Sequence, residues 1–122
     1  MNYFSSMGII PYEQKSELTT SLRISYARDI IKTVAKYHEV PLRLVFKKCR
    51  HRDVVRVRKQ AIYLIMENVY GIYLREVAEL FGKELNYCHK MVIYNRDETR
   101  KFLSAKQDEG YKRDIFVLKT LI

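Results

Sequence analysis

Apolar residues recur at the spacing of an α-helix along most of the chain, and this periodicity restricts the fold more than any other feature. Within each stripe an apolar side chain returns every three or four positions, as on one face of a helix. The stripes occupy residues 24–38, 42–46, 54–69, 74–81, 88–106 and 111–122. No segment alternates apolar and polar residues for long enough to predict a strand. The sequence therefore predicts an all-α fold, a compact helical domain.

Proline and glycine predict where these helices begin and end. Pro41 cannot continue a helix, but it suits the first turn of the next one. Gly71 and Gly82 suit the left-handed conformation that often follows the last residue of a helix. A short helix before Gly82, a turn over 83–87 and a longer helix from about residue 88 then follow one another. This order is that of a helix-turn-helix.

The length of 122 residues predicts one domain. Residues 1–22 contain Ser, Thr, Gly and Pro among a few apolar side chains, and we expect a loosely ordered arm there. Residues 23–109 are expected to form the helix-turn-helix domain. Residues 110–122 form a last amphipathic helix, whose apolar stripe can supply the seam of a homodimer.

Positive charge is concentrated in one window of the sequence. The formal net charge is +9, and residues 43–59 hold eight basic side chains against one acid, Asp53. Side chains of like charge repel one another and destabilise a compact fold, so a need for solubility alone does not explain this concentration. The window indicates a polyanionic partner. Arginine outnumbers lysine in the window, and its forked guanidinium binds phosphate well. Together with the helix-turn-helix, the window predicts a protein that binds double-stranded DNA.

The candidate DNA contacts within the basic window divide into a loop group and a helix group. The loop group precedes the helix of 54–69, and the helix group lies near its start, where the helix dipole disfavours cations. We interpret this unfavourable placement as a sign of phosphate contact. For Arg58, which lies on the same helix, we expect either a phosphate contact or a pairing with an acidic side chain. Tyr63 is expected to lie off the apolar face of this helix. The candidates are Lys48, Arg50 and Arg52 in the loop and Arg56 and Lys59 on the helix.

Several other classes of protein do not fit the sequence. Glu84 stands where a phosphate-binding glycine loop needs a hydroxyl, so neither a nucleotide nor another cofactor is expected. The spacings of Cys49 with His51 and of Cys88 with His89 match no structural zinc pattern. No paired carboxylates and no nucleophile with a base predict an enzyme. No apolar run is long enough to span a membrane, and two cysteines fit a reducing compartment, so we expect a cytoplasmic, nucleoid-associated protein.

Three segments of the chain resemble the C-terminal DNA-binding domain of the bacterial replication initiator DnaA. Residues 31–46 are similar to the first helix of that domain and the short helix after it. Residues 47–64 are similar to its basic loop and the next helix, with Arg-Val-Arg at 56–58 in place of the usual Arg-Pro-Arg. Residues 74–82 are similar to its Leu-Pro-Glu-Ile-Gly…Phe-Gly segment. The resemblance implies a Trp-repressor-like helix-turn-helix that binds DNA.

The resemblance also implies roles for individual residues. In that family the basic loop reaches the minor groove, which assigns this position to Arg50 with Lys48 and Arg52 beside it. The recognition helix of the family reads the major groove through Asp-His-Thr-Thr-Val. This signature aligns with residues 88–92 if the turn after Gly82 is a few residues longer than in the family. An alternative alignment without these extra residues places His89 at the valine position of the signature.

The longer turn keeps His89 and the valine of the signature, but it changes the other three positions. Cys88 replaces the aspartate, and Lys90 and Met91 replace the two threonines. Met91 is either part of the core or an apolar contact to a thymine methyl. Tyr87, just before the helix, is a further candidate that can stack on a base or pack at the edge of the core. The candidates of this helix are therefore Tyr87, Cys88, His89 and Lys90.

The function that these observations predict is sequence-specific binding of double-stranded DNA, related to replication initiation or its regulation in a bacterium or phage. One alternative is a Trp-repressor-like transcription regulator, which would be a dimer on a palindromic site. Another is a protein-interaction module that keeps the fold but no longer reads bases. The changes at Cys88, Lys90 and Met91 motivate this last alternative.

Overall fold

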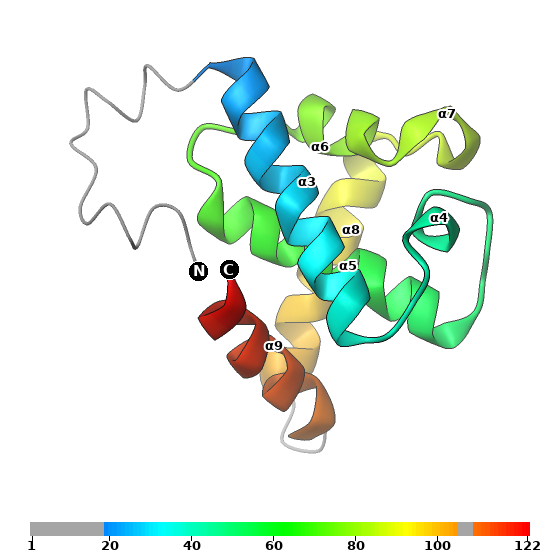
Figure 1. Cartoon of the computed structure of the whole chain (residues 1–122), viewed down its shortest axis with the longest axis vertical. Coiled ribbons are helices and arrows are strands. Elements are labelled where there is room, and N and C mark those ends of the chain that lie inside the picture. Colours follow the sequence, from blue (N-terminus) through cyan, green and yellow to red (C-terminus); the bar gives the residue numbers. More distant parts are fainter. Residues whose placement is uncertain (1–18, 105–108) are drawn as a thin grey trace.

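The computed structural model describes residues 19–104 and 109–122, and every regular element in these two ranges is a helix (Figure 1). The elements are α3 (Thr20–Tyr37), α4 (Leu42–Val45), α5 (Arg52–Asn68), α6 (Leu74–Leu80), α7 (Gly82–Leu85), α8 (His89–Ser104) and α9 (Glu109–Leu121). The predicted all-α fold class is thereby confirmed.

Helix α3 begins inside the range that the sequence assigned to an arm. The first residues of that range, 1–18, lie outside the described part of the chain. The remaining residues form the first turn of α3, because the Thr19 hydroxyl accepts a hydrogen bond from the backbone N–H of Leu22 at 3.2 Å. A capping residue therefore starts the helix before its apolar stripe begins at Ile24.

Helix α5 is the centre of the fold and is enclosed on more than one side. It packs against α3, α4 and α8. Figure 1 shows α3 crossing in front of it. Gln60, Ala61, Ile62 and Leu64 are each fully buried, although successive residues of a helix point in different directions. The expectation that Tyr63 lies off the buried face is wrong, because the neighbouring helices cover more of α5 than a single stripe implies.

A buried carboxylate fixes helix α6 to α3. Glu76 accepts a hydrogen bond from the backbone N–H of Tyr73 at 3.0 Å, which closes the first turn of α6. The same carboxylate accepts a hydrogen bond from Nε of Arg23 on α3 at 3.2 Å. The first helix of the helix-turn-helix is therefore held in place by a charge-assisted contact as well as by apolar packing.

The helix-turn-helix consists of α6, α7 and α8. The short helix α7, Gly82–Leu85, overlaps the predicted turn over 83–87, and no apolar stripe predicted it. The backbone has positive φ at both ends of α7, with 81° at Gly82 and 49° at Asn86, so the chain changes direction twice. Helix α8 then directs one stripe into the core, and its buried residues are Val92, Asn95 and Thr99.

Helix α9 lies at the end of the molecule opposite α6 and α7 (Figure 1). It packs against α3 and α8. Asp114 accepts hydrogen bonds from the Tyr37 hydroxyl at 3.2 Å and from Nε2 of Gln60 at 3.1 Å, so a polar contact also joins α9 to α3 and α5. The apolar stripe of α9 is buried within the chain, whereas Phe116 and Leu121 on the same helix are exposed, and a homodimer through this helix stays a prediction. Its buried residues are Tyr111, Ile115 and Leu118, followed by Ile122.

Candidate nucleic-acid interface

The basic loop joins α4 to α5 and exposes its charged side chains. Lys48, Arg50 and Arg52, the three candidates of the loop group, are all exposed. His51 ends the loop by capping α5, since its Nδ1 accepts a hydrogen bond from the backbone N–H of Asp53 at 3.3 Å. Arg52, which the sequence placed in the loop, is the first residue of α5, so the three cations lie on one short segment that spans the loop and the start of α5 and is open to a ligand.

Arg58 belongs to the basic window but is buried, with 5% of its surface exposed. Neither a phosphate contact nor an acidic partner, the two predicted alternatives, describes it. Its guanidinium instead donates hydrogen bonds to backbone carbonyls at the end of α4 and in the basic loop. The acceptors are the carbonyls of Val45 at 2.8 Å, Cys49 at 2.8 Å, Leu44 at 3.2 Å and Lys47. A buried cation therefore holds the loop in its observed shape.

The basic loop also contacts the turn of the helix-turn-helix. The backbone N–H of Lys48 donates a hydrogen bond to Oε2 of Glu84 on α7, at 2.8 Å and 36 residues further along the chain. This contact places the loop beside the turn that leads into α8. The basic loop, one of the two segments predicted to contact DNA, therefore lies beside the turn that leads into the other, the first turn of α8.

The first turn of α8 is exposed on its outer side. His89, Lys90 and Met91 are exposed, whereas Val92 is fully buried. This pattern agrees with the alignment that keeps His89 and Val92 at their places in the DnaA signature. The ungapped alternative would turn His89 toward the core. Helix α7 accounts for the longer turn that the gapped alignment requires.

Cys88 occupies the position immediately before α8. Its backbone carbonyl accepts hydrogen bonds from the N–H groups of Met91 at 3.0 Å and Val92 at 3.2 Å, and its side chain is exposed. The backbone N–H of Met91 stabilises the thiolate and so lowers the pKa of the Cys88 thiol. Cys88 therefore caps α8 at the place where the DnaA signature has an aspartate.

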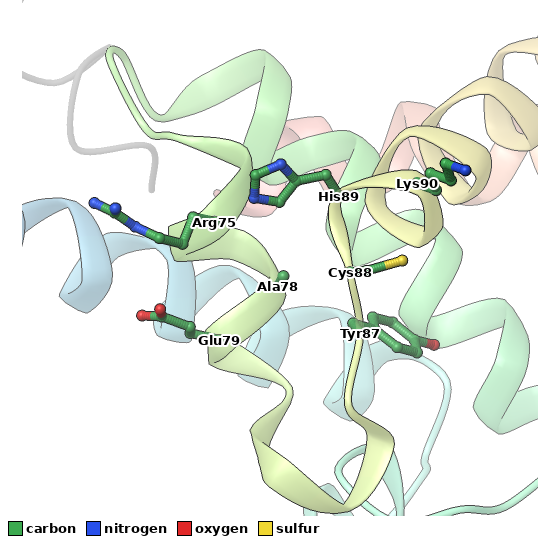
Figure 2. A pocket seen from close by; sticks show the side chains of 7 residues that line it. All are labelled: Arg75, Ala78, Glu79, Tyr87, Cys88, His89 and Lys90. Carbon is green, nitrogen blue, oxygen red and sulfur yellow. The ribbon is translucent and has the colours of Figure 1, made fainter.

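A hollow separates α6 from the start of α8 (Figure 2). Arg75 and Glu79 of α6 line one side of it, and His89 and Lys90 of α8 line the other. Figure 2 shows the imidazole of His89 directed toward α6. Arg75 was not among the predicted contacts, although it is exposed and lies in the third segment that resembles DnaA. Its place in the first turn of α6, the first helix of the helix-turn-helix, makes it a further candidate contact.

Two predicted DNA contacts on α5 face other parts of the protein. Nη1 of Arg56 lies 3.5 Å from Oδ2 of Asp114, and its guanidinium carbon lies 5.3 Å from the centre of the Tyr111 ring. Nζ of Lys59 lies 5.7 Å from the centre of the Phe102 ring near the end of α8. Both cations are thus directed toward the α9 end of the domain, and the structure does not bring them together with the basic loop.

Tyr87 also faces the protein. Its ring centre lies 5.2 Å from that of the buried Phe81. Burial raises the pKa of the Tyr87 phenol, and the nearby Arg58 opposes this effect only in part. Tyr87 therefore packs at the edge of the core, which was the second of the two roles that the sequence left open.

The described ranges hold no group of three or more His, Cys, Asp or Glu side chains that could bind a metal ion. Cys49 and Cys88 are both free thiols. Within residues 19–104 and 109–122, no helix combines the length and the apolar character that a bilayer crossing requires.

The fold and the exposed basic surface define a helix-turn-helix protein of a DNA-binding class. The family model described as the bacterial DnaA protein helix-turn-helix matches residues 27–95, from the middle of α3 to the middle of α8. This match covers more than half of the chain, so the protein belongs to that family, as the resemblance implied. Helix α9 lies beyond the matched residues. No curated protein and no solved structure gives a significant match.

Proposed function

We propose that this protein binds double-stranded DNA at a specific sequence, with the basic loop in the minor groove and the first turn of α8 in the major groove. The observation that carries the proposal is the hydrogen bond from the Lys48 backbone N–H to Glu84, which joins the basic loop to α7, the turn that leads into α8. A basic segment beside a reading helix can occupy adjoining grooves of one duplex. Membership of the DnaA helix-turn-helix family supports DNA as the ligand.

In the minor groove, Arg50 makes the central contact, with Lys48 and Arg52 on the adjacent phosphates. The guanidinium of an arginine is attracted to the negative potential of a narrow minor groove. All three side chains are exposed, and the loop that carries Lys48 and Arg50 is held by the buried Arg58, while Arg52 begins α5. The loop therefore keeps its shape in the absence of DNA, which lowers the entropic cost of binding.

In the major groove, His89 and Lys90 reach base edges or phosphates from the first turn of α8, with Cys88 beside them. A lysine at this place donates to the O6 and N7 acceptors of guanine, and the exposed Met91 can contact a thymine methyl. Arg75, across the hollow, contacts phosphate and fixes the orientation of the helix.

A role in replication initiation or its regulation is part of the same proposal, and it rests on the family. Binding to chromosomal or phage DNA would place the protein on the nucleoid. The changes from the family signature at Cys88, Lys90 and Met91 imply that the preferred sequence differs from the box that the initiator reads.

The experiment that tests the loop uses fluorescence anisotropy with two duplexes, in a series of salt concentrations. One duplex is the sequence that the wild-type chain enriches most from random DNA, and the other is a shuffled sequence of the same composition. The logarithm of the binding constant should fall with the logarithm of salt by about 0.9 per neutralised phosphate. Arg50→Ala should weaken binding to the enriched duplex by about 1–3 kcal/mol. Arg28→Ala, an exposed arginine on α3, is the matched control and should change little.

The reading helix is tested by a second pair of variants. Lys90→Ala should weaken binding to the enriched duplex, while Lys101→Ala removes the same charge about 16 Å further along the axis of α8 and should have little effect. The absence of binding at low salt would refute the proposal. Salt-dependent binding without enrichment of any sequence would refute the major-groove reading and favour a module that no longer reads bases.

A further inference from the structure

Glu84 is an acidic side chain placed next to a surface that we propose binds DNA. Its Oε2 accepts the hydrogen bond from the backbone N–H of Lys48 at 2.8 Å. Both residues are exposed. A carboxylate at this place reduces the attraction of the basic loop for phosphate, so electrostatic attraction does not explain its presence.

The helix that carries Glu84 has a fixed base. Helix α7 follows the fully buried Phe81, whose ring centre lies 5.2 Å from that of Tyr87 on the other side of the turn and 6.2 Å from that of Phe46 at the end of α4. Leu85 of α7 packs against the core. The carboxylate is therefore presented from a segment that is anchored on both flanks.

The loop residue that Glu84 holds is fixed from the opposite side as well. Arg58 binds the carbonyls of Lys47 and Cys49, the two neighbours of Lys48 in the chain. The peptide groups around Lys48 are thus held by a cation from α5 and by an anion from α7. Arg58 fixes the shape of the loop on α5, and the hydrogen bond to Glu84 joins the main chain of the loop to α7, the turn before α8.

We propose that Glu84 is a positioning residue, which sets the place of the basic loop relative to the reading helix so that both segments bind one duplex in a single register. This inference rests on the proposed function. It predicts that Glu84 decreases the affinity for DNA in general and increases the preference for the correct sequence, because a displaced loop cannot enter the minor groove while α8 reads the major groove.

Two variants with the same charge separate these effects. Glu84→Gln removes the charge but keeps an oxygen that can accept from Lys48, and Glu84→Ala removes both. In the free chain, amide hydrogen exchange measures the contact directly: exchange at Lys48 should become about tenfold faster in Glu84→Ala and stay within a few fold of the wild type in Glu84→Gln. Both variants should bind the shuffled duplex more tightly than the wild type does.

The deciding quantity is the ratio of affinities for the enriched and the shuffled duplex. It should fall about five- to tenfold in Glu84→Ala, as expected for the loss of one hydrogen bond of ordinary net strength, and remain near the wild-type value in Glu84→Gln, which keeps an acceptor for Lys48. Equal ratios in the wild type and both variants, or equal losses in both variants, would overturn the positioning role and leave the proposed function standing. A wild-type chain that discriminates between no sequences would overturn both.

Discussion

Replacement of Arg58 by methionine tests whether a buried cation holds the basic loop. The side chain is 5% exposed, and its guanidinium binds the carbonyls of Leu44, Val45, Lys47 and Cys49. Methionine keeps much of the volume but donates no hydrogen bond. The substitution therefore leaves backbone carbonyls at the end of α4 and in the loop without their donor.

The expected cost follows from these contacts. A hydrogen bond from a charged donor contributes about 1.5–3 kcal/mol, but bonds that share one guanidinium are not additive. Water can also reach part of the loop once the cation is gone. We therefore expect Arg58→Met to lower the free energy of unfolding by about 3–4 kcal/mol, more than one such bond contributes and less than the sum of all four. The melting temperature should fall by about 10–20 °C in a domain of this size.

Urea denaturation followed by circular dichroism measures this loss, since the chain has no tryptophan. Arg52→Met is the matched control: it removes an exposed arginine from the first turn of the same helix and should stay within about 0.5 kcal/mol of the wild type. Arg58→Lys should lie between methionine and wild type, because an ammonium cannot reproduce the planar fork. A loss below about 1 kcal/mol in Arg58→Met, or an equal loss in the control, would refute the reasoning.

Three further predictions concern the core, the last helix and the cap of α8. Burial raises the pKa of the Tyr87 phenol above its ordinary 10.0, so the protonated phenol stabilises the fold fully below pH 10, and this stabilisation is lost as pH rises through the folded pKa. Urea denaturation from about pH 9 to about pH 11 should therefore show a shallower fall of the unfolding free energy with pH in Tyr87→Phe than in the wild type. The same dependence on pH in both proteins would contradict this. Asp114→Ala should lower the free energy of unfolding by about 1–3 kcal/mol, because the fully buried Gln60 amide loses its acceptor; a urea midpoint equal to that of the wild type would argue against that contact. At neutral pH, iodoacetamide should modify the exposed Cys88 faster than the half-buried Cys49, and bound DNA should slow the modification of Cys88 but not of Cys49. Peptide mass spectrometry measures both rates, and equal rates for the two cysteines in the free protein would count against the lowered pKa of Cys88.

The helices and their order could be predicted from the sequence because their apolar stripes are long enough to show a period. The stripe of 74–81, the positive φ of Gly82 and the buried Val92 of α8 together define the helix-turn-helix in the structure as in the sequence. Helix α7 could not be predicted in this way, because a helix of four residues has no period to detect. Its place was indicated only by the extra residues that the alignment needed.

The site was predicted less well than the fold, because a count of charges does not say where a side chain points. Arg50 and Arg58 belong to one basic window, yet the first is exposed and the second is buried. The helical period of the sequence could have shown that Arg58 points toward the core. Arg58 follows Val54 by four residues and precedes Ala61 by three, so it lies on the apolar stripe of α5. Arg56 lies off this stripe, and its contacts with Asp114 and Tyr111 of α9 explain why it is only partly exposed.

The hydrogen bonds that Arg58 and Glu84 make to the basic loop involve its main chain. Arg58 binds carbonyl oxygens, which every amino acid supplies, and Glu84 binds an N–H, which every amino acid except proline supplies. The fold therefore places almost no demand on the side chains at positions 48 and 50. These positions can be exchanged to change what the loop recognises without loss of the folded domain, which makes the loop a natural place for divergence between relatives and for the design of new DNA preferences.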